Sequence, residues 1–119
     1  MKILERFVLC DAYTDRVNMT VWAEIKDSCL KIEGRDRGSV VQDVFGVDEY
    51  EYGYDFDKRN TEKLFITLLK HECGQMPRLY TLSLFKKVLL DNYGGMDGCK
   101  RLRDFCDGKK IEYQFYNYM

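Results

Sequence analysis

The sequence contains little of what marks many enzymes and metal sites. Its 119 residues include one proline and one histidine, and none of the five cysteines forms a Cys-x-x-Cys pair. The scarcity of proline and the ordinary mixture of apolar and charged residues exclude a long disordered segment. The single histidine, His71, is two residues from Cys73 on an expected helix, where such positions do not face each other. No local Cys–His pair or zinc-ligand spacing is therefore indicated.

Catalytic and nucleotide-binding motifs are also missing. The sequence has no GxGxxG, GxxxxGK[ST], GxSxG or HExxH motif, so motif evidence for nucleotide, acyl or zinc chemistry is lacking. No apolar run approaches the roughly 18 residues that a membrane span needs. Residues 1–6 lack the apolar core and small-residue cleavage site of a signal peptide. We therefore expect a cytoplasmic protein without a membrane partner.

Cysteine usage agrees with a reducing compartment. The count is odd, which with no export signal indicates free thiols rather than a disulfide framework. Free cysteine usually behaves as a small buried apolar residue. The five are Cys10, Cys29, Cys73, Cys99 and Cys106.

Charge is distributed unevenly along the chain, although the net charge is only −1. Residues 1–57 carry 7 Lys and Arg against 13 Asp and Glu, whereas residues 58–119 carry 12 against 7. Between Asp43 and Asp57 there are six acids and no base. Such asymmetry points either to a basic partner or to an acidic sheet that faces basic helices.

The most regular segment is residues 48–57, where aromatic and acidic residues alternate. A period of two is that of a β-strand, so one face is aromatic and the other acidic. The aromatic face is expected to lie in the core beneath the helices. The exposed aromatic residues would then be Tyr13, Trp22, Tyr116 and Tyr118.

The remaining patterns predict a single α+β domain over residues 1–119. Strands are expected at 3–10, 17–26, 29–34, 48–57 and 111–118, with one helical turn at 39–45. Helices are expected from Asn60 or Thr61 to about 73, from 81 to 93, and from Asp97 to 107. The order is β-β-β-β-α-α-α-β, which favours a mainly antiparallel sheet of about five strands with two to three helices on one face.

These features favour a non-enzymatic protein-interaction domain without a cofactor, a metal or catalytic residues. Its most specific form is an acidic inhibitor or immunity-type protein that binds a basic partner, because acids steer basic proteins and aromatics supply contact area. Such a partner would be one that processes nucleic acid. The expected partner-binding residues are Asp43, Asp48, Glu49, Glu51, Asp55, Asp57, Trp22, Tyr116 and Tyr118.

Two other interpretations remain open. The same carboxylates would suit a small metal-dependent or acid–base enzyme. The last strand would suit an edge-to-edge homodimer. Direct nucleic-acid binding is not favoured, because the lysines and arginines after residue 85 are scattered and the isoelectric point is about 5.9.

Overall fold

We describe the chain from a computed structural model, which describes residues 4–73 and 82–118. The elements follow the predicted order, with the helical turn at 39–45 forming a short helix. They are β1 (Leu4–Tyr13), β2 (Asn18–Lys26), β3 (Cys29–Arg37), α1 (Ser39–Phe45), β4 (Glu49–Asp55), α2 (Lys58–Cys73), α3 (Leu82–Tyr93), α4 (Gly98–Lys109) and β5 (Gln114–Tyr118). The predicted α+β class is confirmed.

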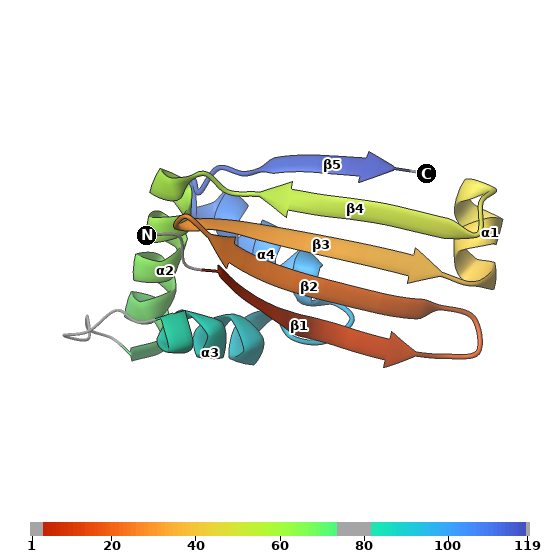
Figure 1. Cartoon of the computed structure of the whole chain (residues 1–119), viewed down its shortest axis with the longest axis horizontal. Coiled ribbons are helices and arrows are strands. Elements are labelled where there is room, and N and C mark those ends of the chain that lie inside the picture. Colours follow the sequence, from red (N-terminus) through yellow and green to blue (C-terminus); the bar gives the residue numbers. More distant parts are fainter. Residues whose placement is uncertain (1–3, 74–81, 119) are drawn as a thin grey trace.

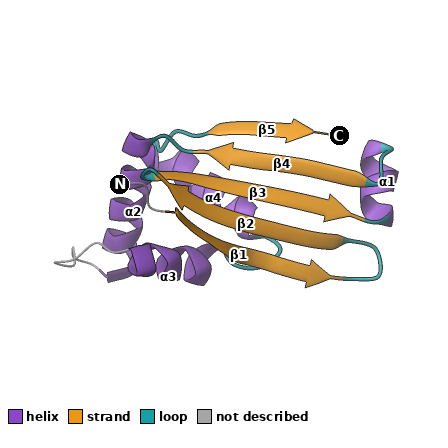
Figure 2. Cartoon of the chain, viewed as in Figure 1, coloured by secondary structure: helices purple, strands orange, loops and turns teal. Residues whose placement is uncertain are grey.

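The five strands form one antiparallel sheet in the order β1-β2-β3-β4-β5 (Figure 1). Each strand therefore pairs with the strand next to it in the sequence. The helices α2, α3 and α4 come between β4 and β5 in the sequence, although these two strands are adjacent in the sheet. In the view of Figure 2, α4 lies behind the strands, while α2 and α3 lie at the end of the sheet opposite α1. No helix of the described residues is long and apolar enough to cross a membrane.

The β2–β3 hairpin shows how the local sequence sets the register. Asp27 and Ser28 form its two-residue turn with φ of 52° and 64°. Positive φ at both positions is what a hairpin turn of the mirror-image type I requires, and Asp tolerates it better than most residues. The register runs from Lys26 opposite Cys29 to Asn18 opposite Arg37.

The core lies between the sheet and the helices. Alternate residues of β2 and β3 enter it, because successive side chains of a strand point to opposite faces. Tyr52, Tyr54 and Phe56 are also buried there, with exposed fractions of 8%, 3% and 2%, as the alternation predicted. The helices contribute the apolar residues Leu64, Leu68, Leu69, Phe85, Leu89 and Leu102.

Tyr50 lies on the same face of β4 as Tyr52 and Tyr54, at the end of the strand that is next to α1. It is half-buried, and its ring stacks on Phe45 of α1 at a centroid distance of 4.4 Å. Helix α1 thus closes the far end of the sheet.

Several element boundaries differ from those predicted: β1 ends at Tyr13 instead of residue 10, β4 ends at Asp55 instead of residue 57, and β5 begins at Gln114 instead of residue 111. Strand β3 continues through Gly34 to Arg37, because Gly34 pairs with Tyr52 and the ladder with β4 extends on both sides of it. Helix α2 begins at Lys58 instead of after Asn60 or Thr61, because Asp57 accepts the hydrogen bond of a first-turn backbone N–H, that of Asn60. Helix α4 continues to Lys109 and ends where Lys110 takes the left-handed conformation, with φ of 57°.

Candidate functional site

The face of the sheet away from the helices carries most of the residues predicted to bind a partner. Register places Trp22 opposite Glu33, Glu33 opposite Gly53, and Gly53 opposite Tyr116. Because side chains alternate, residues two positions away on each strand share that face. The predicted residues on it are Trp22, Glu49, Glu51, Asp55, Tyr116 and, by the register of its backbone, Tyr118. We call this surface the open face.

The acids of β4 on the open face lie beside basic residues of β3. Glu49 Oε1 is 2.7 Å from Arg35 Nε, and Glu51 Oε1 is 3.1 Å from the Nη2 of the same guanidinium. Arg37 Nη2 is 3.4 Å from the second oxygen of Glu49. Opposite charges on adjacent strands stabilise the pairing and cancel each other's field. The acidic row predicted for β4 is thus balanced over half its length.

Two aromatic residues of the open face, Trp22 and Tyr116, are each accompanied by a cation. The Arg6 guanidinium lies 5.4 Å from the centre of the Trp22 ring, and Lys31 Nζ lies 5.7 Å from that of Tyr116. Both cations also approach Glu33, at 3.9 Å and 3.4 Å. Cation–π contacts and ion pairs of this kind hold the side chains in place on an otherwise uncovered sheet.

The three other predicted acids lie outside the sheet. Asp43 of α1 forms an ion pair with Arg16 at 2.6 Å. Asp48 is exposed and makes no ion pair with any residue that the structure describes. Asp57 accepts hydrogen bonds from the backbone N–H and side-chain amide of Asn60, at 2.7 Å and 3.0 Å. It therefore caps α2, and these hydrogen bonds lower the pKa of its carboxyl.

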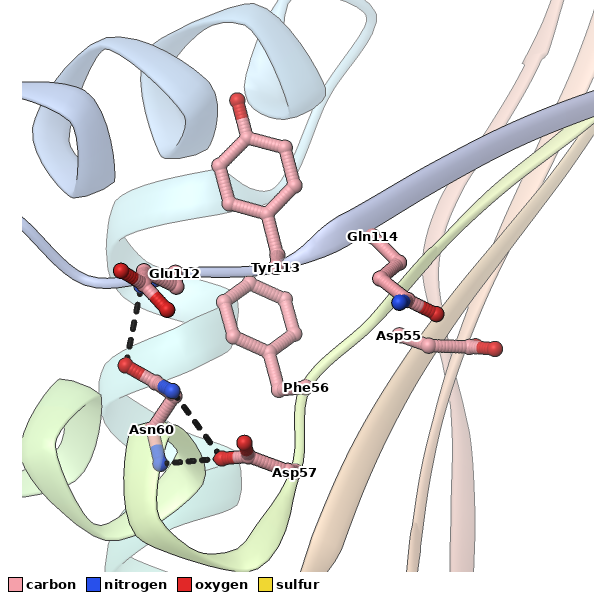
Figure 3. A pocket seen from close by; sticks show the side chains of 7 residues that line it. All are labelled: Asp55, Phe56, Asp57, Asn60, Glu112, Tyr113 and Gln114. Atoms are coloured by element: carbon pink, nitrogen blue, oxygen red, sulfur yellow. Dashed lines mark hydrogen bonds between the residues drawn. The ribbon is translucent and has the colours of Figure 1, made fainter.

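A hollow of about 380 Å³ opens beside this cap, where the end of β4 meets the beginning of β5. Figure 3 shows Asp57, Asn60 and Glu112 on its helical side, Asp55 and Gln114 on its strand side, and the rings of Phe56 and Tyr113 between them. The two rings are 5.6 Å apart at their centres. We call this feature the acidic hollow.

Asn60 connects the start of α2 to the segment before β5 at the acidic hollow. It is buried, and its side-chain oxygen accepts a hydrogen bond of 2.9 Å from the backbone N–H of Glu112. The neighbouring Thr61 hydroxyl accepts one of 2.9 Å from the Leu30 backbone N–H. Part-buried hydrogen bonds of Asn60 thus join the helical side of the hollow to the segment before β5.

The carboxylates of the acidic hollow form no close ion pair among the described residues, and the cations Lys31 and Arg59 act on Asp55 and Asp57 only at longer range. Within the described part of the chain, Asp55, Asp57 and Glu112 have no cationic side chain within the 4 Å of an ion pair. The Oδ1 atom of Asp55 is shielded from solvent and has no hydrogen-bond partner there. Neighbouring carboxylates repel one another, so a cation that enters the hollow would relieve that repulsion.

Metal and thiol chemistry find less support in the geometry. Among the described residues, no group of three His, Cys, Asp or Glu side chains is arranged to hold a metal ion. Burial raises the pKa of Cys10, and it raises the pKa of Cys99 to about 11 and that of Cys106 to about 12. These three thiols therefore stay protonated at neutral pH, whereas a nucleophile must be a thiolate.

Sequence reasoning missed Arg35, Arg37, Glu112 and Gln114. Arg35 and Arg37 continue the alternation that Lys31 and Glu33 begin. The sequence displays this pattern, but the prediction that β3 ends at Gly34 left both arginines outside the strand. Glu112 and Gln114 carried no local signal, because only the fold brings the start of β5 next to Asp55 and Asp57. Comparison of the chain with protein-family models, with curated proteins and with solved structures finds no match.

Proposed function

We propose that this protein is a non-enzymatic protein-interaction domain that binds a basic segment of another protein at the acidic hollow. The observation that carries the proposal is the group of three carboxylates, Asp55, Asp57 and Glu112, which line one hollow without a cation in ion-pair contact among the described residues. A positively charged side chain is the chemical complement of that arrangement.

The acidic hollow is a better site for a basic partner than the middle of β4. A cation approaching Glu49 or Glu51 must displace Arg35 or Arg37, and the exchange of one ion pair for another gains little. At the hollow no such exchange is needed. The charge that attracts the partner is therefore concentrated at one end of the sheet.

The lining favours lysine or, better, arginine as the side chain that enters. Arginine presents a planar fork of donors that suits carboxylates and side-chain amides, and its flat face stacks on aromatic rings. Asp55, Glu112 and Gln114 supply the acceptors, while Tyr113 supplies a ring. Cations on the open face already use the same mode, with Arg6 on Trp22 and Lys31 on Tyr116.

The wider role that we propose is inhibition of a basic protein, of the inhibitor or immunity type. An acidic site beside aromatic residues imitates nucleic acid towards a protein whose cleft is basic. Trp22 and Tyr116 on the open face, with Asp48 and the ion-paired Asp43, Glu49 and Glu51, would form the margin of such an interface. The proposed domain acts by occupying the partner and needs no chemistry of its own.

The direct test is binding of an oligoarginine peptide, followed by fluorescence anisotropy at low and at high salt. We expect saturable binding that weakens with salt, and backbone amide NMR shifts concentrated at residues 55–60 and 112–114. Asp55→Asn combined with Glu112→Gln should weaken binding about tenfold, since exposed charge-assisted contacts contribute roughly 0.5–1 kcal/mol each. Asp57 is left unchanged because it caps α2.

The matched control removes the same amount of charge elsewhere. Asp11→Asn combined with Asp15→Asn lowers the negative charge equally, but at exposed positions near the other end of the sheet. If both double variants weaken the peptide to the same extent, binding follows net charge and the acidic hollow is not the site. Shifts that spread evenly over the surface would contradict the proposal in the same way.

A further inference from the structure

The two edges of the sheet are protected very differently. On β1 the pairing with β2 is interrupted by a bulge between Val8 and Cys10, and the strand carries Glu5, Arg6 and Asp11. Bulges and charges are the features that prevent an edge strand from pairing with another chain. Strand β5 reads Gln-Phe-Tyr-Asn-Tyr, with no charge, proline or glycine. Its register with β4 is continuous from Gln114 to Tyr118.

The outer side of β5 is also uncovered. Of the described elements, only β4 makes an extensive contact with it, and β5 is the outermost strand in Figures 1 and 2. Alternate residues of an edge strand direct their N–H and C=O groups away from the sheet, where they lack a protein partner. Phe115 on the helical side remains 48% exposed. An apolar ring and free backbone groups thus lie along one edge.

We propose that β5 pairs with β5 of a second copy of this chain, antiparallel and about a twofold axis, to form one continuous sheet. The register that pairs all five residues is centred on Tyr116. It places Gln114 opposite the partner subunit's Tyr118, and Phe115 opposite the partner subunit's Asn117. A twofold interface must be complementary to itself, and an uncharged strand meets that condition because no like charges oppose each other.

The second copy is a better occupant than β1 of another molecule. Pairing of β5 with β1 would be head-to-tail and would leave free edges at both ends, so it would grow into an open filament. The bulge and charges of β1 oppose that contact. Pairing of β5 with β5 removes the exposed edge of both copies and stops at two. This inference rests on the edge alone and is independent of the acidic hollow.

The test is sedimentation equilibrium over a wide range of protein concentration. We expect a mass that approaches twice the 14.2 kDa of the chain at high concentration. Asn117→Lys should raise the dimer dissociation constant at least tenfold, because lysine on an edge strand loses hydration when it pairs and the two copies bring two lysines close together. Asn18→Lys on β2 makes the same change on an inner strand and should leave dimerisation unchanged.

Hydrogen exchange locates the interface without any substitution. Peptides that cover residues 114–118 should become more protected as the concentration of the unmodified protein rises, whereas those that cover β1 should not. A mass of one chain at every concentration would overturn the proposal. So would a dimer whose added protection lies outside β5, or one that Asn117→Lys and Asn18→Lys weaken equally.

Discussion

Gly34 of β3 provides the sharpest test of the packing beneath the helices. The ring of Tyr52, on the neighbouring strand, lies directly over it, so an added Cβ would fall inside van der Waals contact with the ring carbons and hydroxyl. Tyr52 cannot swing away easily, because it is only 8% exposed and its hydroxyl donates a hydrogen bond of 3.2 Å to Asp36 Oδ1. Gly34→Ala should therefore be destabilising.

The size of the effect follows from three contributions. Overpacking of a closed core costs about 1–3 kcal/mol, and losing the Tyr52–Asp36 hydrogen bond costs about 1 kcal/mol. Replacing glycine by alanine within a strand returns roughly 0.5 kcal/mol. We expect a loss of about 2.5 kcal/mol in the free energy of unfolding. With an unfolding entropy of about 2.1 cal/mol/K per residue, Tm should fall by about 10 °C.

Gly53 of β4 is the matched control, measured with Gly34→Ala by urea and thermal unfolding. The ring of Tyr116 covers Gly53 on the open face, where the ring is half-exposed and borders solvent instead of a closed core. Gly53→Ala should therefore change stability by no more than about 0.5 kcal/mol. Adding Tyr52→Leu should relieve the Gly34→Ala clash, so the double variant loses less than the sum of the single ones. Equal stability of the two alanine variants would refute this packing argument.

Two further predictions concern buried titratable groups. Burial raises the pKa of Asp36 above its ordinary 3.8 despite the hydrogen bond from Tyr52, so the folded protein loses stability as pH rises from that value through the higher folded pKa. Asp36→Asn should thus raise Tm at pH 7 and lose this advantage below pH 3.8; an advantage that persists in acid would contradict the assignment. The buried Cys10 and Cys106 and the partly buried Cys99, all with raised pKa values, should resist alkylation at neutral pH until the protein unfolds, as read by mass spectrometry of digested peptides; rapid labelling of Cys10 or Cys106 in the folded protein would disprove their burial.

Much of the fold followed from short-range pattern. The period of two at Tyr52, Tyr54 and Phe56 predicted both the strand and its inward face, since burial of aromatic rings dominates the energetics of a small sheet. The change to helical spacing after Asp57 likewise predicted the three later helices. These features depend on neighbours within a few residues, which the sequence displays directly.

The site was less predictable, because it depends on contacts between distant segments. That Arg35 lies between Glu49 and Glu51 follows from the register of β3 with β4, and that register depends on Tyr52 folding over Gly34. The cap role of Asp57 depends on Asn60 being buried against the segment before β5. A carboxylate that the sequence pattern predicts to be exposed can thus have a structural role, and its function cannot be inferred from its charge alone.

The charge asymmetry of the sequence has a different meaning once these contacts are known. Part of its acidic half is neutralised within that half, through Arg35 and Arg37 on β3 and through Arg16 beside Asp43. Among the described residues of the basic half, Lys87–Asp91 in α3 and Arg101–Asp97 at the start of α4 are local ion pairs, whereas Lys86 reaches back across the sequence to Glu5. The overall imbalance therefore does not create a uniformly acidic sheet. Three of the carboxylates that form no ion pair among the described residues line the acidic hollow together, so a partner's affinity should depend on where its basic residues lie more than on how many it has.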